Sequence, residues 1–180
     1  ICNICSSNLV TAESDVEYIQ NKVMAILQSV GIVDIPRSVP IKLVESRIEL
    51  DRMSTIRLGD IHGYTKYEYE KIKNKKIGET FEIYILSHLH RIVFEAVLAH
   101  ELMHVYLFKN NIKLSSQKRE GFCNLGSRLV YEYYNNQFSN IKLDLMKKNK
   151  DPDYGEGYIM MCEILKQNGW HNLLINIEKW

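Results

Sequence analysis

The stretch AHELMHVYLF, residues 99–108, places two histidines and a glutamate within an otherwise apolar run. It belongs to a longer segment, residues 90–108, in which most of the other side chains are apolar. A helix of this composition is expected to be buried on most sides. Burying imidazoles and a carboxylate there costs free energy unless they are paired or bind a metal. The stretch therefore predicts a buried helix that carries a polar site.

His100 and His104 are four residues apart, so on a helix they share one face, with Cβ atoms about 5–6 Å apart. Two imidazoles at that separation can bind one metal ion. Glu101 lies one position further round, beside such an ion. This is the H-E-x-x-H pattern of zinc peptidases, in which zinc lowers the pKa of water and the carboxylate accepts its proton. The alternative is a chance pattern formed by two hydrogen-bonded core histidines.

A hydrolytic zinc site also needs a third protein ligand and an open position for water. Glu120 lies in the first turn of the next predicted helix, residues 117–137, and a short antiparallel connection would bring that turn back beside the metal. In this register Glu120, Asn124 and Ser127 share a face, which suits polar groups that surround metal ligands. Alternatively, Glu120 is an acid that stabilises a helix N-terminus. Three histidines compete with it as ligands: His62, His88 and His90.

The rest of the pattern favours an α+β domain. Apolar spacing predicts helices over residues 14–30, 90–108, 117–137 and 156–167, with a helical tail after Gly169. Strands are predicted over residues 41–45 and 80–86, and the second is a candidate edge strand that an extended peptide could join. Residues 47–78 and 147–157 are expected to be irregular. Helix, strand, strand and then further helices is an order typical of α+β folds.

Length and charge exclude several classes of protein. A chain of 180 residues suggests one domain, and 23 Lys and Arg against 22 Asp and Glu give no electrostatic case for nucleic acid or an anionic membrane. The basic run at residues 71–76 is interpreted as a solvated loop. No apolar stretch approaches the roughly 18 residues needed to span a bilayer. No signal peptide is visible, although the chain starts at Ile1; a cytoplasmic location is expected.

The four cysteines do not form the pattern of a disulfide-rich protein. Cys2 and Cys5 form a C-x-x-C pair, which supplies half of a tetrahedral zinc site. The other half lies upstream, or the pair is a remnant. Cys123 is expected to be a buried structural thiol rather than a nucleophile.

Two segments together, AHELMHVYL and REGFCNLGSRLVYEYY, resemble the plant organ-size-regulating metallopeptidases. These are LIM-domain peptidases activated by ubiquitylation, with shorter bacterial relatives. Three further segments are similar to parts of the family and extend the resemblance over nearly the whole chain: SVPIKLVES, IYILSHLHR and DPDYGEGYIMMCEILKQNGWHNLLINI. The combination of HELMH, EGFC and YGEGY carries the resemblance, because HELMH alone is shared by a very broad clan.

The resemblance implies a zincin-like, gluzincin-like domain. Its small, mostly antiparallel sheet packs on an active-site helix, and further helices follow. In the family the glutamate of the Glu-Gly-x-Cys segment, here Glu120, is the third zinc ligand. The resemblance also implies that residues 1–12 are the remnant of a LIM-like zinc module with Cys2 and Cys5, and that residues 13–180 form the peptidase domain. His90 replaces a family proline. With no complete LIM module and no ubiquitin-interacting segment, ubiquitin regulation is not carried over.

The same resemblance places the segment YGEGY near the site. A phenol from Tyr154 or Tyr158 could then donate a hydrogen bond to the substrate oxygen that gains negative charge. The alternative is a tyrosine that packs beside a glycine turn. His171 is a further candidate donor, for which an exposed helix histidine is the competing interpretation.

Together these observations predict a zinc-dependent endopeptidase that hydrolyses peptide bonds in proteins or peptides. His100, His104 and Glu120 would bind Zn²⁺, and Glu101 would activate water and protonate the leaving amine. The alternative is a non-catalytic protein-interaction module with a structural metal, its shell completed by His62 or His88. No nucleic-acid or membrane partner is expected.

Overall fold

The computed structural model describes residues 8–53, 62–73 and 75–180, so Cys2 and Cys5 lie outside the described residues. A three-stranded sheet has the strand order β2–β4–β3. β4 (Lys75–Leu86) pairs in parallel with β2 (Ile41–Val44) and antiparallel with β3 (Gly63–Ile72). Separately, β1 (Leu9–Val10) pairs antiparallel with β5 (Leu89–His90).

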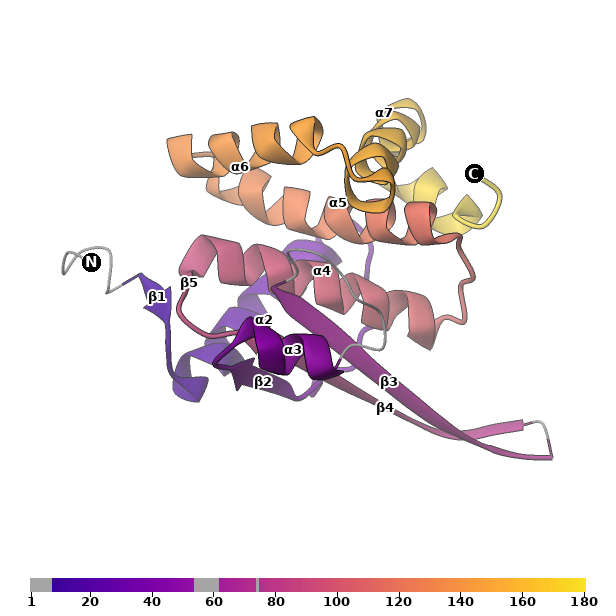
Figure 1. Cartoon of the computed structure of the whole chain (residues 1–180). Helices are drawn as coiled ribbons and strands as arrows, with labels where there is room; N and C mark the ends of the chain where they lie inside the picture. The colour runs from indigo at the N-terminus through magenta and orange to yellow at the C-terminus, as the bar shows by residue number, and fades with distance from the viewer. Residues whose placement is uncertain (1–7, 54–61, 74) are drawn as a thin grey trace.

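The helix α4 (Arg91–Lys109) lies between the sheet and the helices that follow it in the chain (Figure 1). Most of its residues are buried, as the apolar run at residues 90–108 predicts. Apolar side chains of β4 belong to the same core as those of α4 and α2 (Glu13–Gln28). The described residues thus form an α+β fold in which the polar trio of α4 sits inside the molecule.

The C-terminal helices stack beyond α4 (Figure 1). α5 (Ser116–Tyr134) runs back along α4, and α6 (Gln137–Lys148) and α7 (Gly157–Asn176) pack against α5. A single π-helical turn, η1 (Pro152–Glu156), joins α6 to α7. A short helix, α3 (Arg47–Met53), packs on β2 and β4 through a small separate cluster of Val44, Leu50 and Leu86.

Short-range signals define the α4–α5 hairpin. The backbone leaves α4 at Asn110, and Asn111 adopts a left-handed conformation with φ of 53°. α5 then begins at Ser115, whose hydroxyl accepts a hydrogen bond from the Lys118 N–H. Asparagine tolerates the left-handed conformation after a helix, and serine is a preferred N-cap residue. The short connection forces α5 to lie antiparallel to α4, which returns its first turn towards His104.

A buried carboxylate ties three helices together. Glu95 of α4 is fully buried. It accepts hydrogen bonds from Lys22 Nζ of α2 at 3.0 Å and from the Tyr134 hydroxyl of α5 at 2.9 Å. Pairing of this kind removes the large free-energy cost of an isolated buried charge. Glu95 lies closer to the N-terminus of α4 than the two histidines do, so this network is separate from them.

Several sequence-based predictions of the fold were wrong. The described parts of residues 47–78 are not irregular, because they contain α3, β3 and the start of β4. The strand predicted at residues 80–86 is not an edge strand, because β4 is the central strand of the sheet. The helix predicted over residues 117–137 ends at Tyr134, where Asn135 turns left-handed with φ of 42°, and α6 is a separate helix.

The β3–β4 ribbon projects beyond the body of the molecule (Figure 1). The basic run at residues 71–76 lies largely in the two strands at its tip, rather than in the predicted loop. The base of the ribbon is fixed to the end of α4 because Tyr67 stacks on Phe108 with ring centroids 4.8 Å apart. Within the described ranges, no helix is long and apolar enough to cross a membrane.

Gly121 provides a test of the packing between α5 and α7. A Cβ atom at Gly121 would stand well inside 3.0 Å of the Gly157 carbonyl oxygen, a backbone atom that cannot move aside alone. Alanine is a better helix former than glycine, but we expect the overpacking to outweigh this gain, so that the variant is less stable. Gly121→Ala is expected to lower the free energy of unfolding by about 1–3 kcal/mol.

Urea unfolding followed by circular dichroism measures this change. Gly78→Ala is the matched control, because nothing lies within 4 Å of a Cβ atom at that position. Equal stabilities of the two variants would contradict the close approach at Gly121.

Candidate metal centre

The side chains of His100 and His104 from α4 and of Glu120 from α5 converge at one point, and His104 alone of the three is partly exposed. The Nε2 atoms of His100 and His104 are 3.2 Å apart, and Glu120 Oε2 lies 3.3 Å and 3.4 Å from them. A tetrahedral ion bound at about 2.0–2.1 Å separates neighbouring N and O ligands by about 3.3 Å. The three atoms thus form a triangle of the size that such an ion requires.

Glu120 Oε2 has an environment that suits a metal ligand. It is buried and makes no hydrogen bond within the described part of the chain, although both Nε2 atoms lie within 3.4 Å. Burying a carboxylate oxygen without a donor is costly. The atom is therefore placed as a ligand would be, facing two nitrogens that can offer lone pairs to the same ion.

The charges of these side chains point the same way. Burial disfavours the charged forms of both His100 and Glu120, yet their mutual attraction is stronger. The carboxylate raises the pKa of His100 above its usual value, and the imidazoles of His100 and His104 lower the pKa of Glu120. The cluster therefore favours one positive charge at its centre, which a proton or a metal ion can supply.

Each of the three side chains is held by a neighbour on α5. Asn124 Oδ1 lies 3.0 Å from His100 Nδ1, and Cys123 Sγ lies 3.4 Å from His104 Nδ1. Arg119 Nε donates to Glu120 Oε1 at 3.2 Å. Contacts of this kind orient metal ligands and leave the other atom of each group for the ion. All of these supporting residues lie in the segment 119–124, which also contains Glu120.

Cys123 forms a second possible donor set. The Cys123 thiol and the two imidazoles offer ligand atoms within 4.8 Å of one another, so this cluster could bind a metal ion. However, the sulfur lies on the Nδ1 side of His104, whereas Glu120 faces both Nε2 atoms. Burial and nearby carboxylates raise the pKa of Cys123 well above its usual value, and a protonated thiol is a poor ligand. Geometry and charge both favour the set with Glu120.

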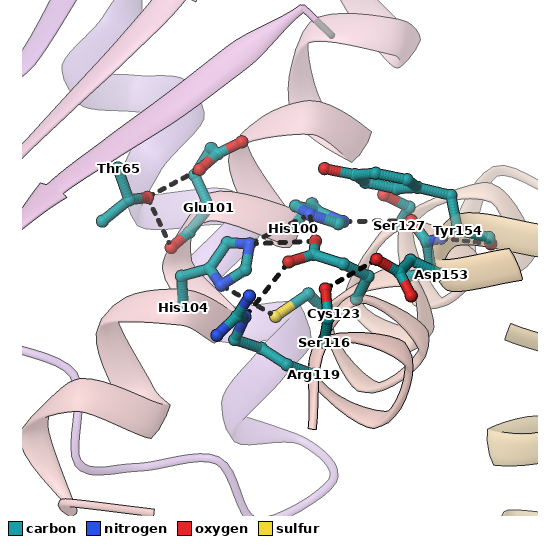
Figure 2. A network of polar contacts seen from close by, with 12 residues as sticks. Thr65, His100, Glu101, His104, Ser116, Arg119, Cys123, Ser127, Asp153 and Tyr154 are labelled. Carbon is teal, nitrogen blue, oxygen red and sulfur yellow. Dashed lines mark hydrogen bonds and ion pairs between the residues drawn. The ribbon is translucent and has the colours of Figure 1, made fainter. Parts of the chain in front are cut away.

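Glu101 points from α4 towards β3 rather than into the triangle of ligands (Figure 2). The Thr65 hydroxyl lies 2.6 Å from Glu101 Oε2 and 3.1 Å from its backbone oxygen. Gly63 leaves room for the other carboxylate oxygen, because a Cβ atom there would stand 2.9 Å from Glu101 Oε1. β3 therefore fixes the position of this carboxylate beside the triangle of His100, His104 and Glu120 ligand atoms.

Tyr154 lies over the imidazole ring of His100. Its ring stacks on the imidazole with centroids 6.0 Å apart, and its hydroxyl end points towards the side on which Glu101 lies (Figure 2). Burial, with a smaller effect of nearby carboxylates, raises the pKa of Tyr154, so the phenol keeps its proton. The η1 turn that carries Tyr154 is held on α5 because Ser116 donates to Asp153 Oδ2 at 2.6 Å.

The other sequence candidates lie elsewhere. Tyr158 is buried beside Cys162 and Arg128 in a cavity away from the histidines. His171 lines a different pocket, with Tyr106 and Trp170. The three competing histidines have other contacts: His62 with Arg47, His88 with Ser87, and His90 with the N–H of Ile92 at the start of α4. Ser127 donates to the Ala96 carbonyl instead of surrounding the ligands.

A family model described as DA1-like, Protein DA1, matches residues 41–143, which is more than half of the chain. The chain belongs to the DA1-like family. The match agrees with the family inferred from the HELMH and EGFC motifs. The DA1-like region runs from β2 into α6, so it contains His100, Glu120 and Asn124 but ends before Tyr154.

Searches among curated proteins and among solved structures gave no match for this DA1-like chain. The LIM-like module predicted at residues 1–12 lies outside the matched region, and it stays a prediction.

Proposed function

We propose that the protein is a zinc-dependent peptidase with a zincin-like variant of the α+β fold. The observation that carries the proposal is the triangle formed by two Nε2 atoms and Glu120 Oε2, with edges of 3.2–3.4 Å. Mixed imidazole and carboxylate ligands in this number are typical of catalytic rather than structural zinc. When bound, zinc supplies a Lewis acid that lowers the pKa of water and polarises a carbonyl group.

In this proposal Glu101 is the general base. It takes a proton from the water whose oxygen forms a bond to the peptide carbonyl carbon. When the carbon–nitrogen bond breaks, Glu101 returns the proton to the leaving amine. The Thr65 hydroxyl, 2.6 Å from Oε2, holds the carboxylate in place for both steps. The protonated phenol of Tyr154 donates to the carbonyl oxygen as negative charge builds there.

β3 offers a surface for an extended substrate. Among the described residues, β3 has only β4 as a strand partner. Leu86 N–H donates to the His62 carbonyl, so the alternation of an antiparallel ladder directs the backbone groups of Gly63 and Thr65 to the free edge. A peptide added at this edge would pass beside Glu101. Substrates are therefore proposed to be proteins or peptides that can adopt an extended conformation.

The alternative function is a non-catalytic interaction module with a structural metal. Cys123 is the observation that favours it, because its thiol and the two imidazoles form a second possible donor set in which a cysteine replaces Glu120. Thiolate ligands are typical of structural zinc sites. In that case Glu101 has no chemical role, and the contact between Thr65 and its carboxylate only stabilises the packing of β3 on α4.

Metal removal from the purified protein tests the proposed function. A strong zinc chelator is expected to stop cleavage of an unfolded, dye-labelled protein substrate, and one equivalent of zinc should restore it. Circular dichroism before and after chelation measures whether the chain stays folded. Cleavage that continues in the metal-free protein would contradict the proposal. A folded, zinc-loaded chain that cleaves nothing in a broad peptide library would instead support the structural metal.

A further inference from the structure

Asn124 makes two hydrogen bonds that join the metal cluster to the η1 turn. Its Oδ1 lies 3.0 Å from His100 Nδ1, and its Nδ2 donates to the Tyr154 carbonyl at 2.8 Å. One end of a single amide thus contacts a proposed metal ligand. The other end contacts the backbone of the residue whose ring covers that ligand.

The chemistry of the groups fixes the direction of both bonds. A backbone carbonyl such as that of Tyr154 can only accept a hydrogen bond, so the NH₂ end of the Asn124 amide must face it. The oxygen end then faces His100, and an amide oxygen can only accept. His100 must therefore carry its proton on Nδ1, which leaves the lone pair of Nε2 for the metal.

We propose that Asn124 is a positioning residue through which the docked Tyr154 turn selects the metal-binding tautomer of His100. If the turn left α5, nothing would keep the amide from rotating its NH₂ group towards Nδ1. That orientation favours a proton on Nε2, where it would block the metal. Docking of Tyr154 and tight metal binding are then one coupled event. The inference rests on the metal centre of the proposed function and adds a link to the substrate-facing turn.

Two substitutions separate the two bonds. Asn124→Ala removes both and is expected to weaken zinc binding about 10- to 100-fold, the usual effect of losing a group that orients a metal-bound histidine. Asn124→Asp keeps an acceptor for His100 but loses the donor to Tyr154. It should retain zinc affinity at the wild-type level while kcat falls to the value of Tyr154→Phe. Chelator competition measures the affinity, and the spectrum of bound cobalt(II) reports whether the coordination geometry is kept.

Ser116→Ala and Gln117→Ala are the matched controls. Ser116 bonds to Asp153, and Gln117 Nε2 donates to the Pro152 carbonyl at 3.0 Å, so each ties the same turn to α5 without touching His100. Each should leave zinc affinity near wild type, because the Asn124 amide keeps its own bond to the Tyr154 carbonyl and the turn stays docked through it. The double variant Asn124→Asp, Tyr154→Phe should have the kcat of Tyr154→Phe alone, because the Asn124 amide and the phenol then act through one step.

Two outcomes would overturn the inference. Asn124→Ala could bind zinc as tightly as wild type, or Asn124→Asp could be as weak as Asn124→Ala. The zinc measurements need no substrate. A chain that binds zinc but cleaves nothing would therefore refute the peptidase while still deciding the role of Asn124. A wild-type chain that binds no metal would refute both.

Discussion

Glu101→Gln is expected to lower kcat for peptide cleavage by about 10³-fold while zinc stays bound, because general-base catalysis is worth roughly 10²–10⁴. Glutamine has nearly the shape of glutamate, and its amide oxygen can still accept from the Thr65 hydroxyl. It cannot accept the proton of the attacking water. Cleavage assays measure kcat, and the zinc content of the same samples shows whether the metal stays bound.

Glu95→Gln is the matched control for this change. Glu95 is a second buried glutamate of α4, but it pairs with Lys22 and Tyr134 rather than with the metal cluster. It should change stability and leave kcat near wild type. If Glu101→Gln cleaved as fast as wild type with zinc bound, the assigned role of Glu101 would be wrong. If it lost zinc, Glu101 would be part of the metal shell.

Glu120→Ala is expected to weaken zinc binding more than Cys123→Ala does. Structural zinc sites contribute roughly 10–16 kcal/mol, so one ligand of three or four carries on the order of 3 kcal/mol, or a factor of about 10² in affinity. The polar contact of Cys123 is with His104 Nδ1, at 3.4 Å. Loss of a group that orients a ligand costs roughly 10- to 100-fold, and a weakly bonding thiol should lie at the lower end, about tenfold.

Chelator competition on the two purified variants, with unfolding curves for each, decides between the donor sets. Loss of the Cys123 thiol removes buried volume, so a change in stability alone is not informative. A larger loss of affinity from Cys123→Ala than from Glu120→Ala would make the thiol a ligand. It would then favour the closed, structural metal site over the peptidase.

Much of the α-helical framework was predictable, because its signals are local. The apolar run around His100 can only be a buried helix, and Asn110 and Ser115 mark the ends of α4 and α5. Once those boundaries are known, the short connection brings Glu120 back to the histidines. That step needs no knowledge of the rest of the chain, which explains why spacing alone already suggested Glu120.

The sheet was predicted less well because its pairings are non-local. The segment GYTKYEYE at the start of β3 alternates poorly between apolar and polar residues, since tyrosines point to both faces. Its partner is β4, and the two strands are covered on one face by α4 and at one end by α3. Thr65 was missed for this reason. Tyr67 and Tyr69, two residues apart, were the available signal for the strand.

The supporting contacts of the metal cluster could be predicted only in part. Asn124 shares a helical face with Glu120, so spacing placed it near the ligands. Its second bond, to the Tyr154 carbonyl, depends on the fold of η1 and has no signature in sequence. Cys123 was expected to be a buried thiol, and it is; its contact with His104 follows from the crossing of α4 and α5.

The three proposed zinc donors all fall within residues 100–120, on two consecutive helices, whereas Glu101 is oriented by Thr65 from a strand earlier in the chain. Ion capture is thus a short-range event along the polypeptide, and alignment of the base is a long-range one. On the proposed function, a partly folded chain, or one whose sheet has been loosened by heat, could bind zinc while Thr65 does not orient Glu101. The zinc content of a sample would then overstate its active fraction, which would have to be measured from turnover.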